Sequence, residues 1–114
     1  MLSAAEFYVE EVVKDRLGRT VFVGVPNQGR GIRVGDKFVF CYEVPRTLDD
    51  VLNDRPRAEP VNQLSVALRV AAIDSMRRSV QELPLGVTGG IYLEGNGVEH
   101  VGRRKFLKTS ESDI

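Results

Sequence analysis

The chain of 114 residues carries 16 basic and 16 acidic side chains, so its formal net charge is zero. This length predicts one domain with one hydrophobic core and excludes a two-domain enzyme. Hydrophobic residues make up 42% of the chain and charged residues 28%, as in globular proteins rather than disordered or membrane proteins. Because the net charge is zero, any binding of nucleic acid has to depend on a local basic patch.

Residue usage also limits the cellular setting and the cofactors. The single cysteine, Cys41, excludes an internal disulfide, and with a single histidine, His100, the usual Cys/His zinc site is not expected. No apolar run approaches the roughly 20 residues needed to span a bilayer. The acidic start of the chain lacks the basic and then apolar pattern of a secretory signal. We therefore expect a cytoplasmic protein with no cofactor, no metal and no membrane partner.

Six segments have the alternation or the short apolar runs that are typical of β-strands. In chain order they are residues 7–13, 20–25, 36–42, 64–73, 91–93 and 104–107. Within the third segment, Phe38, Phe40 and Tyr42 are expected to share one face, because every second side chain of a strand points the same way. The fourth segment holds three alanines and would also suit a helix, but its β-rich neighbours favour a strand.

Most of the eleven glycines lie between these segments, where glycine supplies the positive φ angle of tight turns. Short strands joined by glycine turns predict an all-β domain, a small closed antiparallel β-barrel with a core at about residues 6–108. A long loop at residues 44–61 has three prolines and mixed charge, and its Thr47 and Asp50 suit the start of a short helical turn. Loops of this length are usually functional or mobile. The polar tail, residues 109–114, is expected to fray.

Three motifs occur in a familiar order. The first comprises Phe7-x-Val9-Glu10-Glu11-Val12, Gly18-Arg19 and Gly24, and the second is the turn Gly31-Ile32-Arg33-Val34-Gly35-Asp36. The third runs from Val70 through Met76-Arg77-Arg78, Glu82-Leu83, Gly86-Val87, Gly89-Gly90, Ile91 and Leu93 to Gly95. Together they resemble domain II of the translational GTPases, the β-barrel that follows the GTP-binding domain in elongation factor Tu and its relatives. The resemblance covers residues 7–107 and implies the barrel fold.

The chain also departs from this family. It has no G-x-x-x-x-G-K-[ST] motif to hold a triphosphate, and only six residues precede the first predicted strand. We therefore expect neither an attached GTPase domain nor a bound nucleotide triphosphate. The loop at residues 44–61 is longer than the usual connection. The resemblance thus implies a free-standing barrel without the GTP-driven function of the family.

In that family the barrel helps to hold the aminoacylated end of transfer RNA. By position, Glu10, Glu11 and Arg19 match the family's E-D-V-F and G-R elements, so the resemblance makes them candidates for an RNA contact. Val13 stands where the family has an aromatic residue that would stack on the terminal base, a contact worth about 1–3 kcal/mol. The alternative is that the two glutamates are solvated strand residues and the arginine a charged hairpin residue.

Two basic clusters are further candidates. Arg77 and Arg78 lie in a predicted turn, whereas Arg103, Arg104 and Lys105 enter the last predicted strand. If the fold brings the clusters together, they could neutralise phosphates. Alternatively, they belong to a mixed charged surface that keeps the protein soluble. The aromatic residues that we expect to be exposed, and hence available for stacking, are Tyr8, Tyr42 and Tyr92.

The remaining reactive side chains do not form a recognisable catalytic site. No motif groups a nucleophile with a base and an orienting acid, so an enzyme is not expected. We interpret His100 as an exposed hairpin residue and Cys41 as a small buried one. The three aspartates of the long loop lack the spacing of a calcium-binding loop.

These observations predict a non-enzymatic binding module whose partner is RNA or a ribonucleoprotein. The alternative is a protein–protein adaptor, an inhibitor or a regulatory subunit that uses the same barrel and the long loop. The resemblance favours RNA, and zero net charge favours a protein partner. Exposed strand edges can pair between copies, so both a monomer and a weak homodimer are compatible with the sequence.

Overall fold

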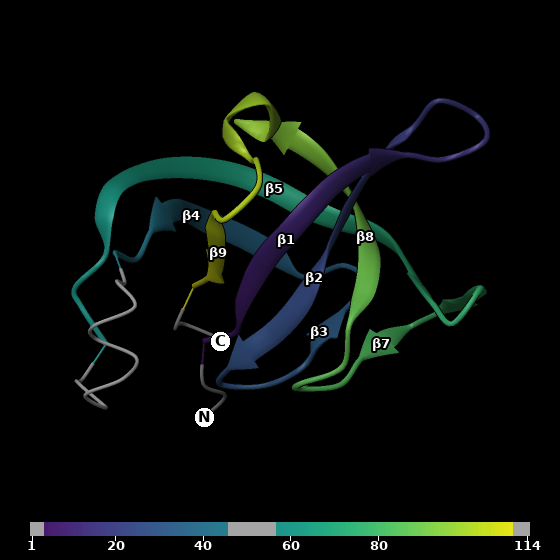
Figure 1. Cartoon of the computed structure of the whole chain (residues 1–114), viewed down its shortest axis with the longest axis horizontal. Coiled ribbons are helices and arrows are strands. Elements are labelled where there is room, and N and C mark those ends of the chain that lie inside the picture. Colours follow the sequence, from purple (N-terminus) through teal and green to yellow (C-terminus); the bar gives the residue numbers. More distant parts are fainter. Residues whose placement is uncertain (1–3, 46–56, 111–114) are drawn as a thin grey trace.

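Antiparallel strands make up most of the structure, a computed structural model that describes residues 4–45 and 57–110 (Figure 1). The strands are β1 (Glu6–Lys14), β2 (Thr20–Gln28), β3 (Ile32–Arg33), β4 (Lys37–Glu43), β5 (Val61–Ser75), β6 (Arg78–Val80), β7 (Glu82–Leu83), β8 (Gly89–Asn96) and β9 (Phe106–Thr109). A single 3-10 turn, η1 (Val98–His100), is the only helical element within these ranges. The all-β prediction is confirmed.

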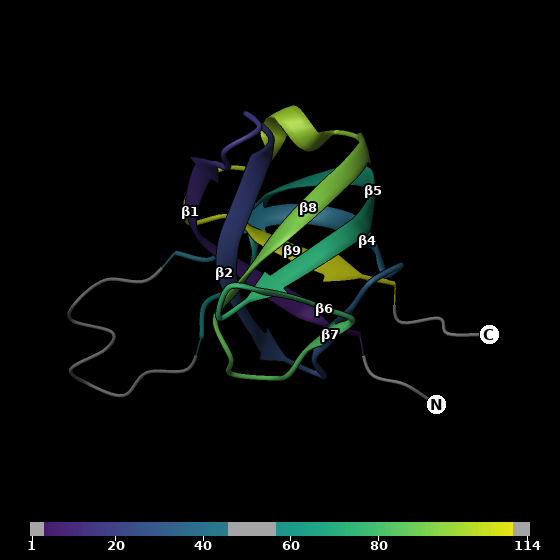
Figure 2. The ribbon, with the colours of Figure 1, turned by 90° about the vertical axis from the view of Figure 1, so that its right-hand side faces the viewer.

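The strands form one large sheet that returns on itself. Its order is β4-β9-β1-β2-β8-β5-β6, and a further pairing of β4 with β5 joins six of these strands in a ring (Figure 2). Strand β6 lies outside the ring as the hairpin partner of β5. Strands β3 and β7 form a separate two-stranded sheet. In such a ring, each strand has one inward face and one outward face.

The hydrophobic core consists of the inward side chains of the ring together with residues of the small sheet. It contains the buried residues Ala5, Phe7, Val9, Phe22, Ile32, Phe38, Cys41, Leu68, Val70, Ile73, Leu83, Ile91, Val101 and Leu107. On β1 the buried Phe7 and Val9 flank the half-buried Tyr8, which therefore points outward. The interior of the ring is thus filled mainly with apolar side chains.

An irregularity in β4 overturns one sequence prediction. The register of β4 on β9 shifts between Phe38 and Phe40, and a bulge of this kind moves the following side chains to the other face. Phe38 and Cys41 consequently belong to the core, whereas Tyr42 stacks on the outward Phe106. The three aromatic residues of β4 do not share one face. The burial of Cys41, by contrast, is confirmed.

Five of the six predicted strand segments are close to the observed strands. Residues 64–73 belong to the long strand β5, so their helical alternative is wrong. The sixth prediction began too early, because Arg103 and Arg104 form a turn and β9 begins at Phe106. The two-residue strands β3 and β7 and the short β6 were not predicted. They are too short for periodicity to be visible.

The predicted loop and tail also differ in part from the structure. Residues 44–45 and 57–60 are irregular, as expected, but β5 already begins at Val61. The predicted helical turn at Thr47 and Asp50 lies outside the described residues. Thr109 is not frayed: it is 4% exposed, and its Oγ1 accepts a hydrogen bond of 2.8 Å from the Ala5 amide. This bond joins β9 to the segment that leads into β1.

The turn of the second sequence motif is built as the residues predict. Gly35 adopts φ 97°, and Asp36 Oδ2 accepts hydrogen bonds of 2.8 Å from the Arg33 amide and from Arg30 Nη1. The backbone of this turn also pairs with Val70 on β5. The Gly35 amide donates to the Val70 carbonyl at 2.8 Å, and the Val70 amide donates to the Asp36 carbonyl. The motif therefore fixes where the small sheet meets the ring.

Candidate functional site

Tyr8 is the centre of the most promising outer surface. It lies on β1 opposite Val25 of β2 and Phe106 of β9, the two strands that flank β1. The Tyr8 and Phe106 rings are 4.8 Å apart between centroids and tilted by 41°. Because Tyr8 is only half-buried, this pair presents an aromatic platform on the outside of the ring.

Two depressions adjoin Tyr8, and both reach Arg104. One, of about 490 Å³, is lined by Tyr8, Glu10, Glu11, Val23, Arg103 and Arg104. The other, of about 560 Å³, is lined by Tyr8, Asn27, Gln28, Val44, Arg57, Arg104 and Phe106. We call the residues Tyr8, Phe106, Arg57, Arg103, Arg104, Asn27 and Gln28, with Glu10 and Glu11, the Tyr8 surface.

Four of the residues selected from the sequence meet at this surface, namely Glu10, Glu11, Arg103 and Arg104. The turn that carries the arginines is held against β1, because the Arg104 amide donates to the Val9 carbonyl at 2.8 Å and the Val9 amide donates to the Lys105 carbonyl at 2.9 Å. Arg104 has φ 71°, a left-handed conformation that this docking stabilises. Over residues 4–45 and 57–110, neither arginine forms an ion pair.

Lys105 is already occupied by a partner within the chain. Its Nζ is 2.9 Å from Glu43 Oε2, which also accepts a hydrogen bond of 3.0 Å from Asn62 Nδ2. The hydrogen bond from Lys105 is the main cause that lowers the pKa of Glu43. This lysine therefore links β4 to the β9 turn, and it is a weaker candidate for a partner contact than its two neighbours.

A buried ion pair between Glu6 and Arg57 packs against Phe106 of the aromatic platform. Glu6 is 3% exposed, and its two carboxylate oxygens accept bonds of 2.8 and 2.6 Å from Arg57 Nη1 and Nη2. The Tyr42 hydroxyl donates to the same carboxylate. The Arg57 guanidinium lies over the Phe106 ring at 5.2 Å, and the Tyr42 ring is parallel to that of Phe106 at 6.0 Å. These contacts fix the orientation of Phe106, on which Tyr8 rests.

The pKa shifts in this cluster follow from its burial and charge. Burial raises the pKa of the Tyr42 phenol, and the adjacent Glu6 carboxylate raises it further. The hydrogen bonds to Glu6 raise the pKa of Arg57 against the opposing effect of burial. Tyr42 is 2% exposed, so the expectation that it would be available for stacking is wrong. Its hydroxyl is used inside the protein.

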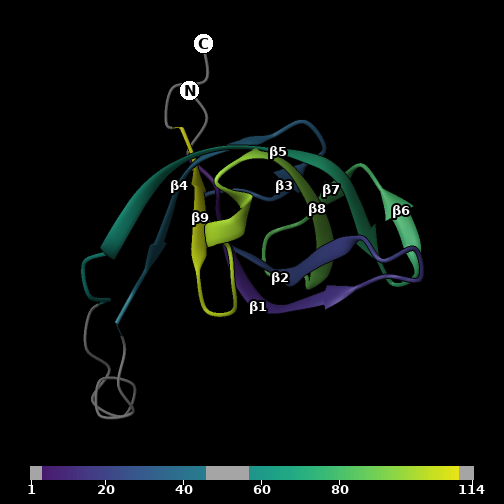
Figure 3. The ribbon, with the colours of Figure 1, turned by 90° about the horizontal axis from the view of Figure 1, so that it is seen from above.

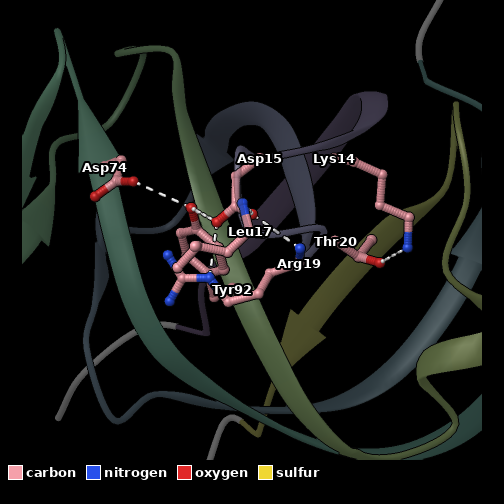
Figure 4. A network of polar contacts seen from close by, with 7 residues as sticks. All are labelled: Lys14, Asp15, Leu17, Arg19, Thr20, Asp74 and Tyr92. Atoms are coloured by element: carbon pink, nitrogen blue, oxygen red, sulfur yellow. Dashed lines mark hydrogen bonds and ion pairs between the residues drawn. The ribbon is translucent and has the colours of Figure 1, made fainter.

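Arg19 lies at a different site, the turn of the β1–β2 hairpin (Figure 4). Its Nε is 2.7 Å from Asp15 Oδ2, and its guanidinium lies over the Tyr92 ring at 4.8 Å. The Tyr92 hydroxyl is 3.0 Å from Asp15 Oδ2 and 3.3 Å from Asp74 Oδ2. Three elements, the β1–β2 turn, β8 and β5, are thereby joined. Arg19 does not line the depression that Glu10 and Glu11 border.

Asp15 is strongly acidic because of these contacts. Desolvation opposes its ionisation, but hydrogen bonds from the backbone and side chain of Arg19, from Tyr92 and from the Leu17 amide outweigh that effect and lower its pKa to about 2. The carboxylate is therefore ionised at neutral pH. A depression of about 760 Å³ beside the network is lined mainly by apolar residues of β1, β2, β5, β8 and η1, with Arg19, Glu94 and Glu99 as its charged members.

Arg77 and Arg78 form a third, separate group at the β5–β6 hairpin. In Figure 1 this hairpin lies at one end of the long axis, well away from β9, so the two basic clusters of the sequence do not meet. Sequence reasoning missed Glu6, Arg57 and Phe106 as parts of the candidate site. No local signal could have revealed them, because Glu6 and Arg57 are 51 positions apart.

The other reactive side chains agree with their sequence interpretation. His100 is exposed, although it lies in the turn η1 rather than in a hairpin. Burial raises the pKa of the Cys41 thiol, which points to the His100 carbonyl at 3.8 Å. In the part of the chain that the structure describes, no group of three His, Cys, Asp or Glu side chains is placed to hold a metal ion. Among the same residues, none forms a helix with the length and hydrophobicity that a membrane span requires.

Comparison with known proteins adds no family. No protein-family model and no curated protein matches the chain. The resemblance to domain II of the translational GTPases accordingly stays an interpretation of the sequence motifs.

Proposed function

We propose that this chain is a non-enzymatic module that binds a single-stranded segment of RNA, free or within a ribonucleoprotein, through the Tyr8 surface. One observation carries the proposal: Tyr8, supported by Phe106, lies next to two exposed arginines that have no ion pair within the described ranges. We further propose that the ring of strands is a closed barrel of the domain II type. The order of the three sequence motifs supports that part of the proposal.

Each component of the surface has a role in this proposal. A base that stacks on Tyr8 would contribute about 1–3 kcal/mol without regard to its identity. Arg103 and Arg104 would neutralise phosphates on either side of the stacked base. The amides of Asn27 and Gln28, which are exposed at the end of β2, can donate to and accept from a base edge.

Glu10 and Glu11 reduce the positive charge of the same surface. They line one depression with the two arginines, so phosphates would meet both attraction and repulsion there. Carboxylates accept hydrogen bonds from the exocyclic amino groups of bases. Because the chain also has zero net charge, we expect binding to depend on the Tyr8 surface rather than on long-range attraction.

Fluorescence anisotropy with a labelled, unstructured RNA of about 12 nucleotides tests the proposal directly, since single-strand sites span about 4–16 nucleotides. Tyr8→Leu keeps an apolar side chain on β1 but removes the stacking surface. It is expected to weaken binding about tenfold. Arg69→Gln is the matched control, because it removes an exposed arginine of β5 that pairs with Glu94.

The arginines are tested by the salt dependence of the same binding. Arg103→Gln combined with Arg104→Asn removes both charges, and asparagine tolerates the left-handed backbone at position 104. The plot of log K against log salt is expected to become shallower, by about 1 in slope for each phosphate contact that is lost. Wild-type protein that binds no RNA, or variants that bind as wild type does, would refute this assignment of the surface.

The alternative function is a protein-binding adaptor, which the zero net charge favours. Affinity purification of the tagged protein from its own cells, with and without nuclease, distinguishes the two functions. Partners that are lost on nuclease treatment support RNA as the ligand. Partners that survive nuclease and depend on Tyr8 would assign the same surface to a protein.

A further inference from the structure

The β5–β6 hairpin ends in a turn that its residues do not favour. Ser75 pairs with Arg78, so the loop consists of two residues, Met76 and Arg77. Their φ angles are 51° and 65°, which identifies a type I′ turn. Such turns favour Asn-Gly, because a side chain larger than that of Asn or Asp is strained at positive φ.

Packing within the described residues does not explain this choice. Met76 is 91% exposed, more than any other large hydrophobic side chain for which exposure is described. Arg77 and Arg78 are also exposed, and in residues 4–45 and 57–110 neither forms an ion pair. Backbone strain that the fold itself does not use is a mark of functional positions. The turn presents one apolar side chain beside two exposed guanidinium groups.

A second turn that exposes an apolar side chain next to an arginine lies at the same end of the molecule. Leu17, in the β1–β2 turn, is 78% exposed and follows the exposed Arg16. Figures 1 and 3 both place the β1–β2 and β5–β6 turns at one end of the long axis. The contacts of Tyr92 with Asp15 and Asp74 join the bases of the two hairpins, so the two turns form one braced unit.

We infer that these two hairpin turns dock on base-paired RNA, with Met76 inserted as a wedge between stacked bases. Arg77 and Arg78 would then contact the phosphates beside the opened step, and Leu17 with Arg16 would form a second contact. Apolar wedges of this kind partly unstack a duplex, and the cost is offset by the additional contacts. The inference rests on the proposed function for the class of partner, but it uses the other end of the molecule.

Charge and shape favour a duplex over a lipid surface. Each turn carries a single apolar side chain next to arginine, which suits a narrow slot between bases with phosphates on both sides. Membrane docking, by contrast, relies on a wide apolar face together with a cluster of basic residues.

The test uses a variant that relieves the strain and removes the wedge together. Met76→Asn combined with Arg77→Gly installs the preferred type I′ residues, so its thermal midpoint is expected to rise. The probe is an RNA hairpin with 2-aminopurine in its stem. Wild-type protein should increase the 2-aminopurine fluorescence by unstacking the base, and the variant should bind this probe about tenfold more weakly without that increase.

Two further measurements make the outcome decisive. The variant should bind the unstructured RNA as wild type does, since the Tyr8 surface is intact; this separates a failure here from a failure of the proposed function. Leu17→Ser should weaken binding of the RNA hairpin without raising the thermal midpoint. Wild-type binding of the RNA hairpin without a fluorescence increase would overturn the inference. So would binding to phosphatidylserine vesicles that depends on Met76 while RNA binding does not.

Discussion

The carboxylate of Glu6 is held by three hydrogen bonds at the beginning of β1, where the side chain has almost no contact with water. A charge in such a position is tolerated only when its partners are present, because the loss of one partner leaves the other buried and unpaired. Arg57 keeps about a quarter of its side chain exposed, 27%, which moderates the cost. We therefore expect the Glu6 cluster, which supports the Tyr8 surface, to contribute measurably to the free energy of unfolding.

Glu6→Gln is expected to lower the free energy of unfolding by about 3 kcal/mol, near the low end for a broken buried pair. Urea denaturation monitored by tyrosine fluorescence measures the change. The exposed pair Arg69–Glu94 supplies the control, since Arg69→Gln should cost less than about 1 kcal/mol. Similar losses in the two variants would show that burial of Glu6 has no energetic weight.

Asp15 makes stability depend on acid pH. Its pKa is lowered from 3.8 to about 2 in the folded chain, so its contribution is present above the unfolded value and is lost as pH falls through the folded value. We expect the thermal midpoint of the wild type to fall more steeply than that of Asp15→Asn between pH 3.8 and about 2. Calorimetry across this range tests the sign. Parallel curves for the two proteins would contradict it.

At the scale of single elements, backbone conformation decides several positions that packing does not. An added Cβ at Gly35 and at Gly102 would meet no atom within 4 Å, but only Gly35 has a positive φ angle. The two glycines therefore separate conformational strain from steric clash. The β4 bulge and the β5–β6 turn are further places where backbone geometry sets which side chains face outward.

Gly35→Ala is expected to lower the free energy of unfolding by about 1–2 kcal/mol, because a Cβ at this φ is disfavoured. Gly102→Ala, in equally open space, should be neutral within about 0.5 kcal/mol. Chemical denaturation of both variants gives the comparison. A loss at position 102 as large as that at position 35 would show that φ is not the cause.

At the scale of the whole molecule, the ring of strands encloses the one cysteine. Cys41 of β4 is 1% exposed. It pairs with Leu107 of β9, and its thiol points to the carbonyl of His100 in the η1 turn. A thiol with this little exposure reacts slowly unless the surrounding strands separate. Reaction with a thiol reagent therefore reports how often the ring opens.

Labelling of Cys41 by an aromatic disulfide reagent is expected to be slow in the native protein and to accelerate with urea in proportion to the unfolded population. The control is Ser79→Cys in a Cys41→Ala background, which places the thiol on the exposed part of β6 and should react at once. Rapid labelling of native Cys41 would show that β4 separates from the ring without global unfolding.

Local sequence patterns were enough to predict the fold class and most of the strands. Alternating side chains, β-branched residues and glycine turns depend on neighbours along the chain, and such local effects can be read from the order of residues. They predicted β1, β2, β4, β5 and β8, the turn at Gly35-Asp36 and the burial of Cys41. They did not predict the β4 bulge, because a bulge depends on the partner strand.

Tertiary structure alone decided how the candidate residues are grouped. It placed Glu10 and Glu11 beside Arg103 and Arg104, separated them from Arg19 and from the β5–β6 turn, and buried Glu6 against Arg57. Each of these groupings joins residues that are far apart in the chain. The pairing of β1 with β9 and the docking of the turn before β9 on β1 bring them together, and these long-range contacts leave no mark in local sequence.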